Sequence, residues 1–217
     1  MRKTTSIEAV STEPITRLLL VRHGEVEAKY QRVFGGRIDM ALSPRGVEQA
    51  QRVAEHLRGV RLDAIYASPM KRAQQTLAPI VALNGHQPIT LQGLREVDFG
   101  AWTGLAWEQV KERFGLSAFQ WLTELDRGGI PEAESPADYR ARTEDCLRQI
   151  LGGNAGRTVA IVCHGGVIRM LLAQLLALPL PRMAGFEIDY ASMTLVHCRP
   201  HKTEVQFLNF TPWRDLL

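Results

Sequence analysis

Two short apolar runs constrain the fold of this chain more than any other feature. Residues 17–21 (RLLLV) and 158–164 (TVAIVCH) are rich in aliphatic side chains, and a glycine stops each run soon afterwards. Runs of this length and composition are typical of strands that are buried on both faces of a sheet. Similar but weaker patterns predict four further strands, at residues 62–68, 88–92, 193–198 and 205–210.

Helical patterns separate these strands along the chain. Ser43-Pro44 and Ser68-Pro69 each place an N-cap serine before a proline that suits the first helical turn. We expect these pairs to open two helices, and three more are expected further on, at about 103–114, about 136–151 and from Gly165 onward. Strands that alternate with helices predict an α/β fold with a largely parallel sheet.

The length of 217 residues suits one compact domain better than two. We expect a single domain over residues 17–217, preceded by a flexible N-terminal extension over residues 1–16. The N-terminus has no apolar central run, so we do not interpret it as a signal peptide. The most apolar stretch, residues 170–180, is about half as long as a membrane span requires, and we interpret it as a buried helix.

The cysteines and the net charge indicate where the protein is located and which kinds of partner it has. The three cysteines, Cys146, Cys163 and Cys198, are odd in number and widely spaced. This pattern fits reduced thiols, and a cytoplasmic location is therefore expected. The net charge of +3 is mild, and aromatic and basic residues are not interleaved as in nucleic-acid binders. We expect a small anionic substrate and neither a nucleic-acid nor a membrane partner; the oligomeric state stays open, a homodimer included.

Polar residues gather directly after the predicted strands. In open α/β sheets, ligands bind beyond the carboxyl ends of the strands. The residues found there are Arg22 and His23 after the first strand, Arg72 after the second, Glu96 after the third, and His164, Gly165 and Gly166 after the fourth. Two histidines, two arginines and one carboxylate are thus expected to converge on one edge of the sheet.

This set of side chains suits the transfer of a phosphoryl group. Arg22 and Arg72 can each offer a planar pair of hydrogen bonds to a phosphate, and the helices that begin near Arg72 and after His164 add backbone donors. A neutral His23 is a competent nucleophile, because surrounding cations disfavour its protonated form. His164 is expected to bind the transferring oxygens, and Glu96 to act as proton donor and then as base. We expect no metal and no cofactor, because clustered ligands with metal-like spacing are missing.

Four sequence blocks resemble the signatures of a known family. They are LLLVRHGEVEA (18–28), ASPMKRAQQT (67–76), LREVDFGAWTG (94–104) and VAIVCHGGVIR (159–169). Together and in this order they are similar to the histidine phosphatase superfamily, the phosphoglycerate mutase-like group with an Arg-His-Gly motif. The resemblance runs from about residue 17 to about residue 200. It implies a three-layer α/β/α sandwich, and it implies for the five residues above the roles already assigned to them.

The resemblance adds further candidates. It implies that Gly35 and Gly36 belong to a loop that closes over substrate, and that Glu134-Ser135 corresponds to another family marker. Lys29 stands where the family often has an asparagine that contacts phosphate, so Lys29 either binds the anion or points to solvent. Gly165 is a further candidate for phosphate binding. The run from Val97 to Phe99 differs from that of the glycolytic mutases and resembles the branch of broad-specificity and α-ribazole phosphatases.

The sequence therefore predicts a metal-independent phosphomonoesterase that acts on a small phosphorylated metabolite through phosphorylated His23. Three alternatives stay open at this point. A mutase would pass the phosphoryl group to a second hydroxyl, and a non-catalytic protein would only bind a phosphorylated ligand. The third is a cysteine-dependent phosphatase, because Cys163 and Arg169 have the Cys-x5-Arg spacing. Trp102 and Trp107 are candidates either for the substrate entrance or for the core.

Overall fold

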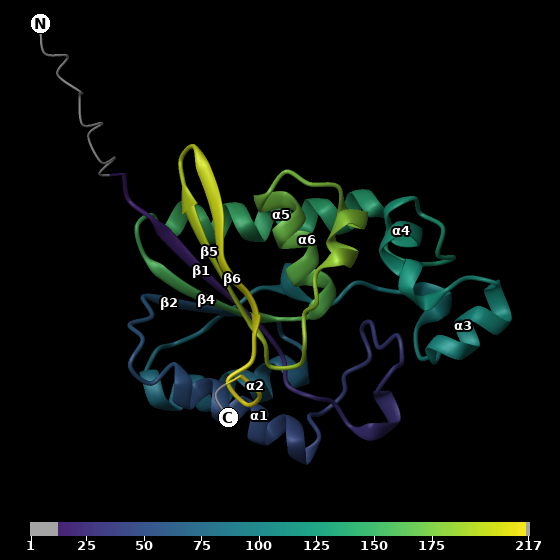
Figure 1. The fold of residues 1–217 in the computed structure, drawn as a ribbon, viewed down its shortest axis with the longest axis horizontal. Helices are drawn as coiled ribbons and strands as arrows, with labels where there is room; N and C mark the ends of the chain where they lie inside the picture. The colour runs from purple at the N-terminus through teal and green to yellow at the C-terminus, as the bar shows by residue number, and fades with distance from the viewer. Residues whose placement is uncertain (1–12, 216–217) are drawn as a thin grey trace, which may run out of the picture.

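The computed structural model describes residues 13–215 and contains a six-stranded sheet with the order β3-β2-β4-β1-β5-β6 (Figure 1). The strands are β1 (Thr16–Arg22), β2 (Ala64–Ala67), β3 (Ile89–Thr90), β4 (Thr158–Cys163), β5 (Met193–Arg199) and β6 (Lys202–Phe210). The first four pair in parallel, whereas β5 and β6 join antiparallel at one edge. The predicted, mostly parallel sheet is confirmed. Residues 1–12 of the expected extension lie outside the described residues.

The side chains of the central strand β1 explain why its sequence is apolar throughout. Leu18 and Leu20 pack into one hydrophobic cluster, and Leu19 and Val21 pack into a second cluster on the other face. Successive side chains of a strand point to opposite faces, so a sheet that is covered on both sides needs apolar residues at every position.

Two pairs of helices supply these covers. The helices are α1 (Pro44–His56), α2 (Lys71–Asn84), α3 (Trp107–Phe114), α4 (Trp121–Asp126), α5 (Pro136–Gly153) and α6 (Gly165–Leu175). Helices α1 and α2 cover one face of the sheet and α5 and α6 cover the other (Figure 1). The predicted α/β/α sandwich is confirmed. No helix in the described part of the chain is long and apolar enough to cross a membrane.

The two Ser-Pro pairs behave differently. Ser43 caps α1 as predicted, because its side chain accepts a hydrogen bond from the Gly46 N–H at 3.0 Å. The prediction that Ser68 caps the next helix is wrong: α2 begins at Lys71 and its N-cap residue is Met70. The Ser68 hydroxyl instead contacts a histidine of the candidate site, as described below.

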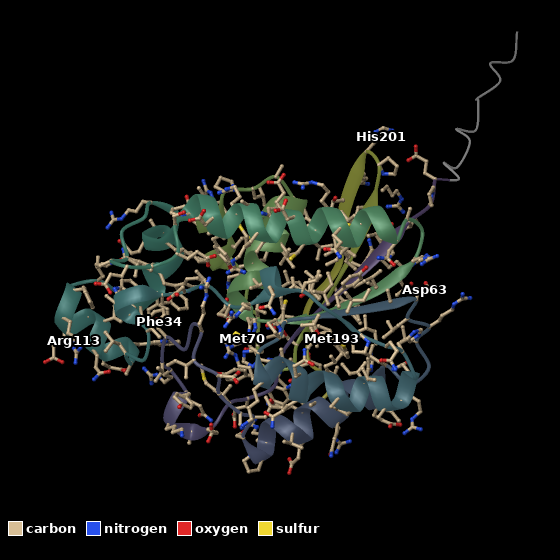
Figure 2. The ribbon with its side chains drawn as sticks, turned by 180° about the vertical axis from the view of Figure 1, so that it is seen from behind. Phe34, Asp63, Met70, Arg113, Met193 and His201 are labelled. Atoms are coloured by element: carbon tan, nitrogen blue, oxygen red, sulfur yellow. The ribbon has the colours of Figure 1, made fainter. Side chains whose placement is uncertain are left out.

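The segment between β3 and α5 departs most from the expectation. The helix expected from about residue 103 begins only at Trp107, and the short helix α4 lies between the two helices expected at about 103–114 and about 136–151, where no helix was expected. Helices α3 and α4 lie to one side of the sandwich (Figure 1). In the side-chain view, Met70 and Met193 lie in the middle of the molecule, and Arg113 of α3 lies at its outer edge (Figure 2).

Candidate active site

The pairing of β1 with β4 brings the two histidines of the candidate site together. Arg22 and Cys163 are partners in the parallel register, so the residues that follow them leave the sheet side by side. The rings of His23 and His164 are 5.2 Å apart between centroids and meet edge to face. Two residues that are far apart in the sequence thus form one pair at the carboxyl edge of the sheet.

Arg72 connects the two imidazole rings. It lies in the first turn of α2 and is only 2% exposed. Its Nε–H points at both rings, with 3.1 Å to His23 Nε2 and 3.2 Å to His164 Nδ1. Its terminal nitrogens donate to the carbonyl oxygens of Ile38 and Gly36 at 2.8 and 2.9 Å. The guanidinium is therefore fixed in orientation before any substrate binds.

The hydrogen bonds assign the tautomers of the two rings. His23 Nδ1 lies 2.8 Å from the Gly24 carbonyl oxygen, which can only accept, so Nδ1 carries the proton and Nε2 keeps its lone pair. His164 accepts from Arg72 at Nδ1 and therefore carries its proton at Nε2, 2.7 Å from the Ser68 hydroxyl. Ser68 thus orients His164, a role that its position next to a proline did not reveal.

Burial and nearby cations keep both rings neutral. Burial lowers the pKa of His23 well below its usual value, and the charges of Arg72 and Arg22 lower it further. Burial and Arg72 likewise lower the pKa of His164. At neutral pH, His23 therefore presents an unprotonated Nε2, which is the form required of a nucleophile.

Two further arginines have donor capacity to spare. Arg22 donates to the Ile188 carbonyl oxygen at 2.6 Å, and its guanidinium carbon lies 4.0 Å from the ring centre of Tyr190. Arg169 of α6 donates to the carbonyl oxygens of Gly165 and Phe186. In both arginines the Nε atom is buried without a hydrogen-bond partner among the described residues. An anion placed between these side chains could accept from them.

The carboxylate of Glu96 reaches the same region from the loop after β3. One oxygen accepts from the Gly166 N–H at 3.1 Å, and the other accepts from the Val97 N–H at 3.0 Å. A Cβ atom at Gly166 would lie only 2.4 Å from Glu96 Oε1, so only glycine leaves room for the carboxylate here. Glu96 is thus held by the start of α6 rather than by its sequence neighbour Arg95.

A cavity of about 500 Å³ collects most of the predicted site residues. Its lining includes Arg22, His23, Gly35, Gly36, Arg72, Glu96 and Gly165. His164 is fully buried and lies behind Arg72, outside this lining. Lys29 also lies outside it: the Lys29 side chain is 65% exposed, and its Nζ is 3.7 Å from a Glu27 carboxylate oxygen. Of the two alternatives for Lys29, the structure therefore fits the solvent-facing one.

The cavity also contains residues that the sequence did not reveal. Arg169, Tyr190 and Asp189 line it, as do Trp107 and Phe119. Arg169 was considered only as part of a cysteine-dependent pattern and Trp107 only as a possible entrance residue, and no pattern indicated Tyr190, Asp189 or Phe119. The two tryptophans considered as entrance residues divide: Trp107 lines the cavity, and Trp102 is fully buried in the core.

The cysteine-dependent alternative does not fit this geometry. Cys163 is completely buried in the hydrophobic cluster beneath α6 and does not line the cavity. Burial raises the pKa of its thiol well above the usual value, so the reactive thiolate is disfavoured at neutral pH. Among the described residues, no group of three or more His, Cys, Asp or Glu side chains is arranged to hold a metal ion.

Comparison with known proteins agrees with this geometry. The model of the histidine phosphatase superfamily (branch 1) matches residues 18–211. Phosphoserine phosphatase 1 of Hydrogenobacter thermophilus is 30% identical over 91% of this chain and 93% of its own length. The adenosylcobalamin/alpha-ribazole phosphatase of Escherichia coli is 26% identical over 89% of this chain and 95% of its own length.

A solved structure of a phosphatase has the same fold as this chain. A mycobacterial glucosyl-3-phosphoglycerate phosphatase superposes with a TM-score of 0.80 at 26% identity, and the match covers 90% of this chain and 99% of that one. The resemblance to the phosphatase branch of the family is thus confirmed. The chain belongs to the histidine phosphatase superfamily and is a phosphatase, an enzyme that hydrolyses phosphate monoesters.

Proposed function

We propose that the protein hydrolyses the phosphate ester of a small metabolite in two steps, through a phosphoryl group carried on Nε2 of His23. The observation that supports this most directly is the tautomer of His23. Its Nδ1–H donates to the Gly24 carbonyl oxygen, so the lone pair is on Nε2, inside a cavity that also holds Arg22 and Arg72. The Arg72 Nε–H donates to this lone pair at 3.1 Å, and a bound phosphorus atom would take the place of that contact. A buried, neutral imidazole among fixed cations has the properties that attack on a bound phosphate requires.

In the first step, His23 Nε2 attacks phosphorus and the ester P–O bond breaks. Arg22 and Arg72 hold the phosphoryl oxygens, and protonated Glu96 gives its proton to the departing alkoxide, which leaves as an alcohol. Neutral His164 accepts from Arg72 at Nδ1 and so keeps the guanidinium directed at the reacting group. The products of this step are phosphorylated His23, Glu96 carboxylate and the alcohol.

In the second step, water replaces the alcohol. The Glu96 carboxylate takes a proton from the water as it attacks phosphorus, the N–P bond breaks, and inorganic phosphate leaves. Glu96 is protonated again and His23 is neutral, so the cycle closes. The chemistry uses these side chains alone, and we therefore propose that no metal takes part. The three free cysteines, all buried, are compatible with the reducing cytoplasm as the place of action.

The relatives support a small phosphorylated substrate. Two of the proteins compared above are named for phosphoserine and for glucosyl-3-phosphoglycerate, both phosphate esters of small hydroxylated acids. A mutase would share the first step but transfer the phosphoryl group to a second hydroxyl. Incubation with a phosphoglycerate separates the two: free phosphate is expected, whereas an isomeric phosphoglycerate would indicate a mutase.

The decisive test follows the phosphoryl group. A radiolabelled phosphate ester, quenched rapidly during turnover in the presence of a chelator, should leave an acid-labile label on the protein. His23→Ala should abolish both the label and phosphate release, and His201→Ala, on the exposed end of the β5–β6 hairpin, should change neither. Turnover by His23→Ala, or label on another residue, would contradict the mechanism. A protein that binds phosphate esters without turnover would be a binding protein.

A further inference from the structure

The cavity leads from the buried phosphate-binding residues to a group of aromatic side chains. His23 and Arg72 are 4% and 2% exposed, whereas Phe119, which lines the same cavity, is 77% exposed. Phe99, Trp107 and Trp121 line it as well. We call Phe99, Trp107, Phe119 and Trp121 the aromatic wall.

The rings of the aromatic wall support one another. Phe99 and Trp121 meet edge to face with ring centres 5.4 Å apart, and Trp107 and Phe119 do so at 5.5 Å. Phe119 is the most exposed large apolar side chain among the described residues, and together with the three rings beside it, it forms continuous apolar surface of the kind that marks a ligand-binding groove. Phe119 lies on a short turn at the cavity mouth, where the part of a ligand that extends beyond the phosphate would cover it.

Arg32, the charged residue beside the aromatic wall, already forms an ion pair with Glu108. The guanidinium carbon of Arg32 lies 5.3 Å from the ring centre of Trp107, and its nitrogen pairs with Glu108 at 2.5 Å. Arg32 therefore extends the wall as a flat, partly neutralised surface. Such a surface suits stacking better than the capture of a small charged group.

We infer that the alcohol part of the natural substrate carries a flat apolar group, such as an aromatic ring, that packs against the aromatic wall while its phosphate lies at His23. This inference rests on the proposed phosphatase function and names the class of its substrate. The volume of about 500 Å³ admits a phosphate together with a ring-bearing alcohol. A three-carbon alcohol such as serine would leave the wall in contact with water.

The test compares two esters that differ only in the apolar group. Propyl phosphate and 2-phenylethyl phosphate both release a primary alcohol, so their leaving groups are alike. We expect kcat/KM to be about tenfold higher for the phenyl compound, mainly through a lower KM. Trp107→Ala and Phe119→Ala should remove this preference by lowering kcat/KM for the phenyl compound toward the value for propyl phosphate. Phe207→Ala, an exposed ring on β6, is the matched control and should have no effect.

The outcomes separate this inference from the proposed function. Equal kcat/KM for both esters, or a preference that survives both alanine substitutions, would overturn the role of the aromatic wall while leaving the phosphatase intact. A stronger preference for phosphoserine than for the phenyl ester would overturn it too. If the enzyme hydrolyses neither ester nor phosphoserine, the proposed function itself is wrong.

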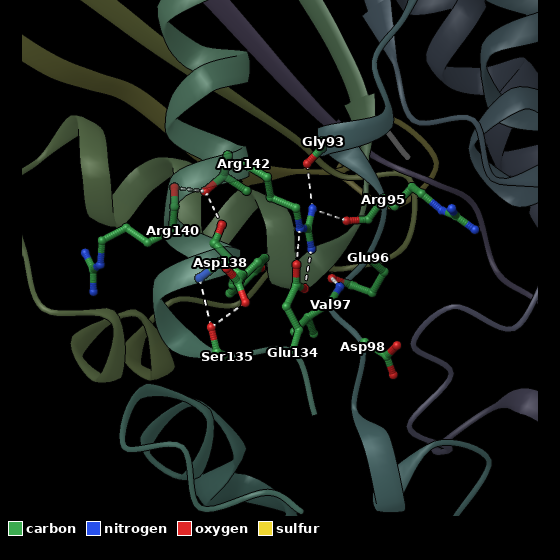
Figure 3. Close-up of polar contacts among 12 residues, drawn as sticks. Gly93, Arg95, Glu96, Val97, Asp98, Glu134, Ser135, Asp138, Arg140 and Arg142 are labelled. Carbon is green, nitrogen blue, oxygen red and sulfur yellow. Dashed lines mark hydrogen bonds and ion pairs between the residues drawn. The ribbon is translucent and has the colours of Figure 1, made fainter. Parts of the chain in front are cut away.

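A second inference comes from the polar network beside Glu96 (Figure 3). Arg142 of α5 binds Glu134 through two parallel contacts, Nε to Oε1 at 2.5 Å and a terminal nitrogen to Oε2 at 2.8 Å. Its remaining terminal nitrogen donates to two backbone carbonyl oxygens, that of Gly93 at 2.5 Å and that of Arg95 at 2.7 Å. One guanidinium thus uses all of its edges.

The second of these carbonyls belongs to the peptide bond that joins Arg95 to Glu96. Arg142 therefore fixes the chain directly before the proposed proton donor. The side chains of Arg142 and Glu134 are only 18% and 7% exposed, so their paired contacts are little screened by water. The Glu134 carboxylate orients the Arg142 guanidinium, and the guanidinium fixes the loop at Gly93 and Arg95 through their carbonyl oxygens.

The geometry points to Arg142 and Glu134 as positioning residues for the carboxylate of Glu96. Arg142→Lys keeps the charge but cannot hold Glu134 and both carbonyls at once. We expect the rate of the first, phosphorylating step, measured in a burst experiment, to fall about tenfold more for propyl phosphate than for p-nitrophenyl phosphate, because p-nitrophenolate leaves without a proton. Glu134→Gln should show the same selective loss.

The control lies on the same helix. Arg148 of α5 pairs with Asp145 on the surface at 2.8 Å, and Arg148→Lys should slow neither substrate. Both rates are measured on the same sample of each variant, so partial unfolding lowers both and leaves their ratio intact. An equal loss for both substrates in Arg142→Lys and Glu134→Gln would show a purely structural role and overturn the inference.

Discussion

The backbone N–H of Gly166 donates to the carboxylate of Glu96 across 3.1 Å, although the two residues are 70 positions apart in the sequence. The glycine is required for contact rather than for backbone freedom, since an added Cβ would lie 2.4 Å from the carboxylate oxygen. The start of α6 therefore determines where the proposed proton donor can lie.

Gly166→Ala should damage activity without damaging the fold. The new methyl group meets the movable end of a side chain, so Glu96 can swing aside, and alanine favours the helix by about 1 kcal/mol. Displacement of the carboxylate should lower kcat for an alkyl phosphate about a hundredfold. Steady-state kinetics and thermal melting test this. Gly152→Ala, near the end of α5 with open space around it, is the control. Unchanged kinetics in Gly166→Ala would mean that the contact with Glu96 has no catalytic importance.

Glu96→Gln should reveal the acid by its dependence on the leaving group. The amide cannot protonate an alkoxide, so turnover of an alkyl phosphate should fall about 10²- to 10⁴-fold. Release of p-nitrophenol needs no proton and should suffer far less in the first, phosphorylating step. A burst experiment that isolates this step gives the comparison. If both leaving groups slow equally in that step, Glu96 is not the acid.

The two buried histidines should make stability depend on pH. Both have pKa values lowered well below the usual 6.5 by burial and by Arg72, so below pH 6.5 the unfolded chain binds protons that the folded chain does not. The free energy of unfolding should therefore fall as the pH drops below 6.5, by about 1.4 kcal/mol per pH unit for each histidine.

Denaturant titrations between pH 7 and pH 5 measure this slope. His23→Gln should remove about half of the part that the two rings contribute. The matched change at His56, an exposed residue at the end of α1, is the control. A slope that is the same in His23→Gln as in the natural protein would show that His23 is not held neutral by the fold.

Cys163→Ser should separate the two phosphatase chemistries. The thiol lies in the core and outside the cavity, so kcat should stay near its natural value. The free energy of unfolding should fall by about 1–3 kcal/mol, because a hydroxyl enters an apolar site. The activity of Cys163→Ser, measured below its melting temperature, distinguishes the two chemistries. An inactive Cys163→Ser beside an active His23→Ala would reverse the assignment of the nucleophile.

The sequence predicted those parts of the site that depend on strand ends. His23 and His164 follow directly after β1 and β4, and their neighbourhood results from the parallel register of these strands. Arg72 follows from the same logic, because it lies in the first turn after β2. The apolar runs made these strands recognisable, since a strand that is covered on both faces must be apolar throughout.

The remaining parts depend on loops whose path no local pattern records. Ser68 was expected to cap a helix, yet its hydroxyl binds His164, because α2 starts at Lys71 instead. Tyr190 reaches the cavity from a segment without a motif. For Lys29 the sequence left contact with phosphate and contact with solvent as alternatives, and the structure turns its side chain toward Glu27. Spacing along a chain fixes side-chain direction within a strand or helix but not beyond it.

The central position of β1 in the sheet affects when the active site can assemble during synthesis of the chain. This strand is made first, but both of its neighbours, β4 and β5, belong to the second half of the chain. Pairing strands that are so far apart in the sequence is slow, because the entropy cost of closing the loop is offset only when β4 and β5 form their contacts with β1. During synthesis, His23 at the end of β1 is therefore present before His164 can lie beside it. A fragment that ends before β4 lacks His164 and a neighbouring strand of β1, so it should release no phosphate.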